Sequence, residues 1–307
     1  MGLINAEDPL PGHVWATVRL LLASKERSLA AADAQALLAP PSLGERSSSI
    51  FRKTTRLLSQ FGLLDNSDGL LRIANDELAA VHRDDVQTFA GLLRRVFFAD
   101  EQNTELTAPT GEVSQTGALD LNRALAWFLS LDPYTGYDLE AELPRASKAL
   151  RPEAGSKALV REERLSPFRA WSQFLGLASS RVVIAGGRGG ENDFLSRIAP
   201  DCTPAARSVL RTSDELTKGS AVPAPAVLSL LRKEIPVVPG GRHSIEVGIT
   251  PPDTDTAGSV LSYALLRGQD EGWLVLDRLS DSEHRVHLID PDAGGNVKSI
   301  SHITIVE

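Results

Sequence analysis

Apolar residues recur at helical spacing in three stretches near the start of the chain. In residues 13–23, Val14, Val18 and Leu21 fall on one stripe. Residues 28–39 are rich in Ala and Leu and end at two prolines, where a helix stops because proline has no amide hydrogen. Residues 47–61 repeat the apolar spacing behind a serine suited to cap a helix. This pattern predicts three consecutive helices.

A hairpin is predicted directly after these helices. Residues 63–74 read LLDNSDGLLRIA, in which two short apolar runs flank residues that tolerate the positive φ angles of a tight turn. Three helices followed by a hairpin are typical of a winged helix-turn-helix domain. We therefore predict such a domain over residues 1–75.

The middle region, residues 76–220, is predicted to be mainly helical. Helical spacing is found in residues 76–106, 119–131, 156–177 and 200–218, while residues 107–117 read as a loop and RVVIA reads as a strand. Residues 119–200 are a candidate for a second winged module.

Residues 221–307 are predicted to form a C-terminal winged-helix-like domain. Helices are expected at 225–232 and 258–267, and the strands EGWLVLDRL and EHRVHLI are expected to pair around residues 280–283 before a last strand, ISHITIV. Three segments, one in each region, run from an amphipathic helix through a glycine into an apolar strand. The predicted fold is thus mainly α with small β-hairpins (α+β), with tandem winged modules joined by a helical region.

Composition narrows the class of protein. The 307 residues are 42% hydrophobic and 23% charged, as in ordinary globular proteins, and the net charge of -8 argues against bulk coating of DNA. A single cysteine, Cys202, cannot form an internal disulfide, and no signal-like or membrane-spanning stretch is recognised. We expect a cytoplasmic protein that does not contact a membrane.

A basic cluster marks the third predicted helix. Arg46, Arg52, Lys53 and Arg56 occur with no acidic residue among them, and their spacing directs them away from the apolar stripe. In a winged helix-turn-helix domain this third helix enters the major groove, where Arg can bind guanine and Lys can bind phosphate. We predict that these four residues contact double-stranded DNA, together with Arg72 on the return strand of the hairpin. An ordinary solvated helix face is the alternative.

The last predicted helix differs in charge. Residues 201–307 contain 10 basic and 15 acidic residues, so a DNA reader is not expected there. Ser262, Tyr263 and Arg267 fall on the polar side of this helix. We predict that they contact another protein or the rest of this chain.

The sequence contains no complete catalytic or cofactor motif. The glycine-rich AGGRGG, residues 185–190, matches neither the dinucleotide nor the Walker pattern. Three histidines, His284, His287 and His302, lie near the end of the chain, but His284 and His287 would point to opposite faces of a strand. Asp290 and Asp292 lack the partners of a nuclease site. We expect no enzymatic activity, no metal and no cofactor.

Several segments resemble the DpdG family. They are FRAWSQFLGLA, PDCTPAARSVL, LSYALLRGQDEGWLVLDRLSDSEHRVHL and KSISHITI, and the likeness is strongest over residues 168–303. Where the family usually reads Pro-Asp-Pro-Thr, this chain has Cys202 in the third position. The resemblance implies a bacterial cluster that inserts 7-deazaguanine derivatives into DNA and restricts DNA lacking them, with ATPase, helicase or nuclease subunits as partners. It supplies no catalytic residues.

These observations predict a non-catalytic DNA-recognition or adaptor subunit of a bacterial restriction or phage-defence complex. The first alternative is a free-standing winged-helix transcription regulator, which should dimerise and show a half-site spacing. The second alternative is a divergent nuclease, which metal-dependent DNA cleavage would reveal.

Overall fold

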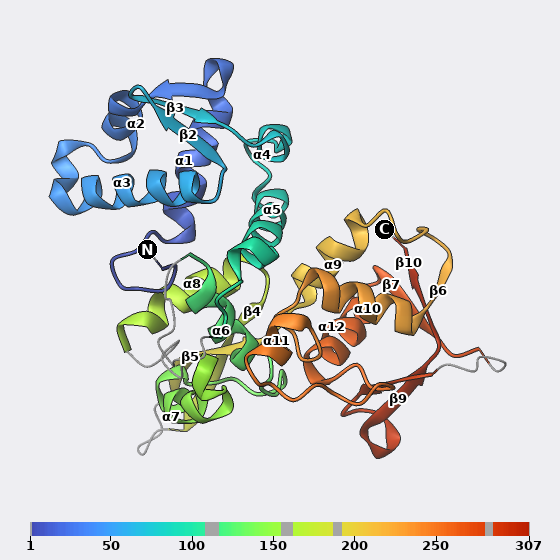
Figure 1. Cartoon of the computed structure of the whole chain (residues 1–307). Helices are drawn as coiled ribbons and strands as arrows, with labels where there is room; N and C mark the ends of the chain where they lie inside the picture. Colours follow the sequence, from blue (N-terminus) through green and yellow to red (C-terminus); the bar gives the residue numbers. More distant parts are fainter. Residues whose placement is uncertain (1, 108–116, 155–161, 187–191, 280–284, 307) are drawn as a thin grey trace.

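Helices dominate the protein, and its sheets are small and antiparallel, in agreement with the predicted fold class. The structure, a computed structural model, describes residues 2–107, 117–154, 162–186, 192–279 and 285–306. An N-terminal unit, a middle region and a C-terminal unit follow one another along the chain (Figure 1). No helix within these ranges is long and apolar enough to cross a membrane.

The N-terminal unit contains the three predicted helices and the predicted hairpin. Its elements are α1 (Pro11–Ala23), β1 (Ser28–Ala30), α2 (Ala31–Leu38), α3 (Gly44–Gln60), β2 (Leu64–Ser67) and β3 (Leu70–Ile73). The second helix is shorter than expected, because its first three predicted residues form β1, which pairs with β3. Local spacing could not reveal this long-range pairing. The sheet order is β1-β3-β2.

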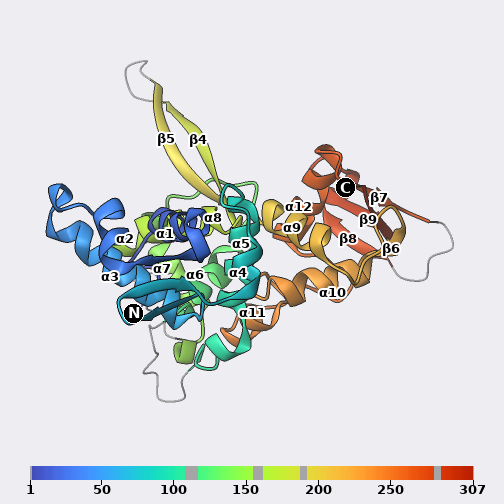
Figure 2. The ribbon, with the colours of Figure 1, turned by 90° about the horizontal axis from the view of Figure 1, so that it is seen from above.

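The middle region is mainly helical, as predicted, and ends in a long hairpin. Its elements are α4 (Asp76–Ala80), α5 (Val86–Phe98), α6 (Leu119–Phe128), α7 (Leu139–Ala149), α8 (Leu165–Phe174), β4 (Ala178–Gly186) and β5 (Asn192–Pro200). Helix α7, which contains a proline, Pro144, was not expected from the sequence. Seen from above, β4 and β5 project away from the body of the protein (Figure 2). Most of the predicted loop at 107–117 and the predicted helix start at 156 lie outside the described residues.

The C-terminal unit includes one helix that was predicted within the middle region, and it has a larger set of strands than predicted. Its elements are α9 (Thr203–Thr212), β6 (Ala221–Pro223), α10 (Ala224–Glu234), α11 (Arg242–Glu246), α12 (Ser259–Asp270), β7 (Leu274–Asp277), β8 (Val286–Ile289), β9 (Val297–Ile300) and β10 (His302–Ile305). The helix predicted within the middle region is α9, which packs on α10 and α12. The predicted pairing of β7 with β8 is wrong. Strand β7 pairs with β10, whereas β8 pairs with β9. Short alternating strands do not specify their partner, because each presents the same apolar face to the core.

Short 3₁₀ helices connect some of these elements. They are η1 (Lys25–Arg27), η2 (Pro41–Leu43), η3 (Asp100–Gln102), η4 (Pro152–Ala154), η5 (Glu162–Arg164) and η6 (Gly294–Asn296).

Helices α3, α8 and α12 end in the same way, at the three similar segments noted in the sequence. At the end of α3, Gly62 has a φ of 68°, its amide donates to Ser59 O, and the amide of Leu63 donates to Leu58 O. Gly176 and Gly272 have the same conformation and the equivalent hydrogen bonds after α8 and α12. This is the Schellman motif, which needs a positive φ and therefore favours glycine. In each case the motif ends the helix and turns the backbone into the strand that follows.

The same order of elements recurs in all three regions. In the N-terminal unit, β1 precedes α2 and pairs with the second strand of the hairpin, β3. In the C-terminal unit, β6 precedes α10 and pairs with β10. In the middle region a single bridge, between Tyr137 and Ile198 of β5, takes the place of the first strand before α7. Each region therefore ties the start of its second helix to its hairpin.

A line of aromatic side chains joins the N-terminal unit to the middle region. The rings of Phe61 and Phe97 lie 4.9 Å apart between centroids, and those of Phe97 and Trp171 lie 5.5 Å apart. Trp171 is fully buried, and its indole nitrogen donates to Pro9 O at 3.2 Å. Burial of large aromatic surface stabilises such a junction strongly, so the two parts pack as one body.

Candidate nucleic-acid interface

Helix α3 separates an apolar face from a basic face. Phe51 and Leu58 are buried on the inner side, where α3 packs on α1 and β2. Arg46, Arg52 and Arg56 are exposed on the outer side. In the part of the chain that the structure describes, none of these three guanidinium groups has a hydrogen bond or an ion pair. They are available to an anion from solution.

Lys53 lies beside these arginines but is not free, which corrects the prediction of four outward cations. It is half-buried, and its ammonium group donates to Glu7 O at 3.0 Å and pairs with Glu7 Oε2 at 3.2 Å. Glu7 is distant in the sequence, so the spacing within α3 could not reveal the contact. Lys53 therefore fastens the N-terminal segment to α3.

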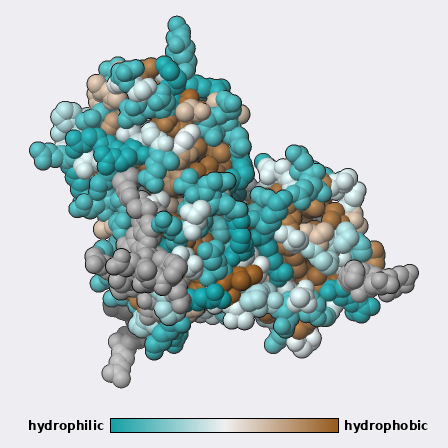
Figure 3. Space-filling model, viewed as in Figure 1, coloured by the Kyte–Doolittle hydropathy of each residue, from teal (hydrophilic) through white to brown (hydrophobic). Residues whose placement is uncertain are grey.

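Arg72, the fifth predicted DNA contact, is exposed on β3. In the sheet it lies opposite Asp65 on β2, and Asp68 occupies the turn with a φ of 53°. The hairpin thus offers one cation beside two carboxylates. A phosphate would meet a weaker positive potential here than at α3. Hydrophilic residues cover most of the visible surface of the N-terminal unit (Figure 3).

An apolar groove beside the basic face was not anticipated from the sequence. It has a volume of about 260 Å³ and is lined by residues of α1, α2 and α3, among them Leu38, Ile50 and Arg46. Leu43 also lines it and is 63% exposed. The feature of the sequence that could have indicated this groove is a leucine, Leu43, between two predicted helices.

Ser262, predicted on the polar side of the C-terminal helix, is instead fully buried in α12. Its hydroxyl accepts a hydrogen bond from the amide of Ile289 on β8 at 2.9 Å. Ser262 is buried because β8 and β9 form an additional hairpin that covers this side of α12. Ser262 cannot contact a second protein without unfolding.

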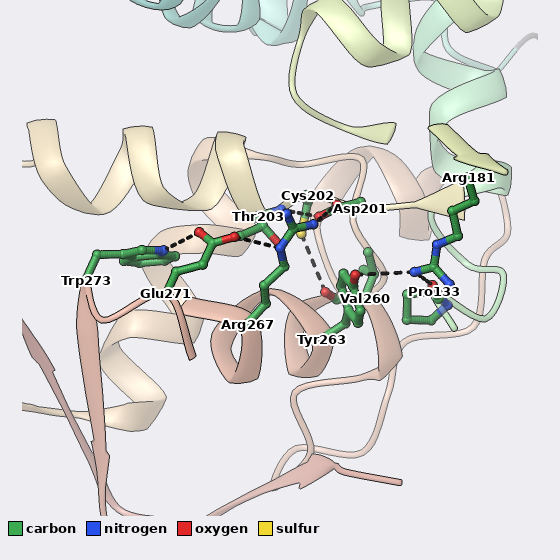
Figure 4. A network of polar contacts seen from close by, with 10 residues as sticks. All are labelled: Pro133, Arg181, Asp201, Cys202, Thr203, Val260, Tyr263, Arg267, Glu271 and Trp273. Carbon is green, nitrogen blue, oxygen red and sulfur yellow. Dashed lines mark hydrogen bonds and ion pairs between the residues drawn. The ribbon is translucent and has the colours of Figure 1, made fainter. Parts of the chain in front are cut away.

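Tyr263 and Arg267 contact other parts of this chain (Figure 4). The hydroxyl of Tyr263 accepts from Arg181 Nη2 at 3.3 Å, and its ring meets the edge of Tyr134 at 5.2 Å between centroids. Arg267 forms ion pairs of 2.7 Å with the buried Asp201 and with Glu271. Helix α12 is thereby fixed to the β4–β5 hairpin and to the start of α9.

Cys202, beside Asp201, is completely buried, and its thiol donates to Val260 O at 3.6 Å. Burial, and secondarily the charge of Asp201, raise the pKa of this thiol. A thiol held in its protonated form is a poor nucleophile.

The histidines and acids considered for chemistry are dispersed. In the ranges that the structure covers, no three His, Cys, Asp or Glu side chains lie together as metal ligands. His287 contacts Ser299 and lies 3.7 Å from Asp255, while His302 contacts Ser301. His284, the turn at 280–283 and most of the AGGRGG segment lie outside the described residues.

A protein-family model described as DpdG-like matches residues 1–282. No curated protein and no solved structure matches the chain.

Proposed function

The chain belongs to the DpdG-like family, which associates it with the Dpd modification and defence system, and from this premise we propose that it is a non-catalytic DNA-recognition or adaptor subunit of that system. Its proposed partners are double-stranded DNA and the larger proteins of the system, such as ATPase, helicase or nuclease subunits.

The observation that carries the proposal is the basic face of α3. Arg52 and Arg56 lie one helical turn apart, are exposed, and have no carboxylate partner among the described residues. Guanidinium groups placed in this way can donate two hydrogen bonds to guanine or to phosphate. The flanking hairpin is the place where a winged helix-turn-helix has its wing. We therefore assign DNA contact to Arg46, Arg52, Arg56 and Arg72, with Lys53 contributing less.

The C-terminal unit supports the adaptor part of the proposal. Its region is net acidic, which disfavours a polyanion. Ile289 and Val297 are register partners on β8 and β9, and they are 38% and 47% exposed. Two adjacent apolar side chains on an outer hairpin are suited to contact with a protein.

The DNA-binding proposal is tested with the full chain and the double variant R52E/R56E. We expect binding to a labelled duplex, measured by fluorescence anisotropy at low salt, to be lost, because two favourable charges become repulsive. The control R278E/R285E reverses two exposed arginines of the C-terminal unit, so both variants shift the net charge of -8 by the same four units. The control should bind as the unchanged protein does.

Equal weakening by both double variants would contradict an interface on α3. Binding as a dimer to two regularly spaced half-sites would instead favour a transcription regulator.

The adaptor role is tested by co-purification with the neighbouring gene products. We expect I289D/V297D to lose association with the larger subunits while retaining DNA binding, because both side chains are exposed and their replacement leaves the core intact. Unchanged co-purification would exclude this hairpin as the docking surface.

The non-catalytic assignment is tested with plasmid DNA and Mg²⁺ or Mn²⁺, and with ATP. We expect no turnover. Cleavage that persists through further purification and is lost in D290N/D292N would establish a nuclease instead.

A further inference from the structure

A second positively charged feature lies between α5, α9 and α12, away from the elements assigned to DNA. It is a cleft of about 450 Å³, a size common for small-molecule sites. Four arginines line it against one acid, Glu271. They are Arg95 from α5, Arg207 and Arg211 from α9, and Arg267 from α12. Helices α5 and α9 lie side by side in both ribbon views (Figures 1 and 2).

Some of this charge is already paired. Arg95 contacts Glu77 at 2.5 Å, and Arg267 is held by Asp201 and Glu271. Arg207 lies 5.9 Å from the centroid of the Trp273 ring. Arg211 is exposed and forms no ion pair with a described residue. The cleft therefore combines guanidinium groups that already have partners with one, that of Arg211, that is exposed and forms no ion pair with a described residue.

Arg94, next to Arg95, does not line the cleft itself but places a buried charge behind its α5 wall. Its side chain is almost completely buried and donates to Leu175 O at 2.8 Å, but no described carboxylate pairs with it. Burial and then the charge of Arg95 lower the pKa of Arg94 to about 10. A buried cation without a counter-ion is unfavourable. An anion bound nearby would therefore be stabilised by its attraction to Arg94.

A residue with an unsatisfied hydroxyl also lines the cleft. Thr203 at the start of α9 is 2% exposed and lines the cleft, and its Oγ1 has no hydrogen-bond partner among the described residues. Buried hydroxyls are normally satisfied, so this atom lacks a partner that a ligand oxygen could supply. Ser208 lies across from Gly91, where an added Cβ would be 3.4 Å from the Ser208 hydroxyl and 3.5 Å from Arg94 Nη2. Glycine thus lets α5 approach the Ser208 hydroxyl closely at this side of the cleft.

We propose that this cleft binds a phosphate-bearing ligand, with Arg95, Arg207 and Arg211 as charge partners and Thr203 and Ser208 as hydroxyl partners. Arginine suits phosphate because its planar fork donates two parallel hydrogen bonds. The phosphate comes either from a free nucleotide-like molecule or from the backbone of nucleic acid. The inference is independent of the proposed role of α3.

The test uses the full chain and inorganic pyrophosphate, with titration calorimetry and thermal shift as readouts and sodium chloride of equal ionic strength as the reference. We expect saturable binding and a raised melting temperature. The variant R95Q/R211Q should weaken binding about tenfold or more, because two charge-assisted hydrogen bonds are lost. Both side chains are exposed, so the fold should persist. The control R19Q/R278Q removes two exposed arginines elsewhere and should bind normally.

A second variant, Gly91→Leu, fills the space between α5 and α9 without changing charge and should also reduce binding. Pyrophosphate binding no stronger than the chloride reference, or equal in the unchanged protein and R95Q/R211Q, would overturn the proposal.

Two further arms identify the source of the phosphate. If the phosphate belongs to nucleic acid, R95Q/R211Q should weaken duplex binding and pyrophosphate should compete with DNA. If it belongs to a free ligand, DNA binding should be unchanged in this variant. R52E/R56E should retain pyrophosphate binding in either case, which separates this site from the basic face of α3.

Discussion

The N-terminal and C-terminal units share an order of elements but differ in the exposure of their last helix. Helices α3 and α12 both end at a Schellman glycine and lead into a strand whose sheet is closed by an earlier strand. Relative to that glycine, Arg52 and Arg56 of α3 correspond to Ser262 and Leu266 of α12. The first pair is exposed and charged, whereas Ser262 is buried beneath β8 and Leu266 is half-buried.

This comparison shows that the order of elements does not determine the role of such a unit. In the C-terminal unit an additional hairpin, β8–β9, lies between β7 and β10 and covers one face of α12. The equivalent face of α3 is exposed. Charge follows the same division, with 8 basic and 7 acidic residues in positions 1–75 and an acidic excess in positions 201–307. Function is carried by the side chains that remain accessible.

The largest expected effect concerns the residue directly after the glycine. Trp273 is 1% exposed and Leu63, at the equivalent place, is 0% exposed. We expect Trp273→Ala to lower the free energy of unfolding by about 4 kcal/mol and Leu63→Ala by about 3 kcal/mol, because each leaves a cavity. Urea titration followed by hydrogen exchange should locate the first loss in α12 and the second in α3. A loss spread equally over both units would mean that they unfold together.

Acid should act more strongly on the C-terminal unit. Burial and the neighbouring charge of Arg242 lower the pKa of His243, in α11, from 6.5 to about 4. Above pH 6.5 the imidazole is neutral in both states. As the pH falls from 6.5 towards 4, the unfolded chain gains a proton that the folded protein excludes, so stability falls by about 3 kcal/mol.

This pH dependence is measured by comparing the unchanged protein with His243→Gln at several pH values. Asp120 acts in the opposite direction, because burial raises the pKa of its carboxyl from 3.8 to about 6, so its contribution is full below pH 3.8 and is lost as the pH rises through 6. It is present in both proteins and cancels in the difference. Parallel stability curves for the two proteins would refute the assignment to His243.

The Schellman glycines should tolerate alanine to different degrees. A Cβ at Gly62 would meet no atom of another described residue within 4 Å, whereas one at Gly176 would lie 3.0 Å from Pro204 Cβ and 3.1 Å from Ala205 N. We expect Gly62→Ala to cost about 1 kcal/mol from the positive φ, and Gly176→Ala about 2 kcal/mol or more. Thermal unfolding of both variants measures the difference. Equal costs would show that α9 moves aside.

The smallest expected effect is that of Lys53→Gln. Its ion pair with Glu7 is partly solvated, with Glu7 85% exposed, so removal should cost about 0.5 kcal/mol. DNA affinity should fall less than in R52E/R56E. Chemical unfolding and anisotropy give the two values, and a larger loss of DNA binding than in that double variant would restore Lys53 as a principal contact.

Local features of this sequence predicted local structure well. The apolar spacing around Val14 and Phe51 indicated α1 and α3, and the DNSDG turn indicated the β2–β3 hairpin. The exposure of Arg52 and Arg56 followed from their position opposite Leu58, because a helix places its two faces by spacing alone.

Contacts between distant residues were not predictable in the same way. The pairing of Ser28 with Arg72, the ion pair of Lys53 with Glu7 and the cover of β8 over Ser262 each join segments that no short pattern relates. The cleft was missed for the same reason, since its arginines come from three separate helices. The proposed roles of these residues remain predictions.

The burial of Cys202 makes the protein convenient for site-specific labelling. It is the single cysteine of the chain and is inaccessible, with a raised thiol pKa, so maleimide dyes should not react with it in the folded protein. A cysteine introduced at the exposed Ser166 or Ser196 would then be the one reactive thiol, without removal of the native residue. Energy transfer from such a dye to one on a bound duplex would report directly on how DNA is oriented along the chain.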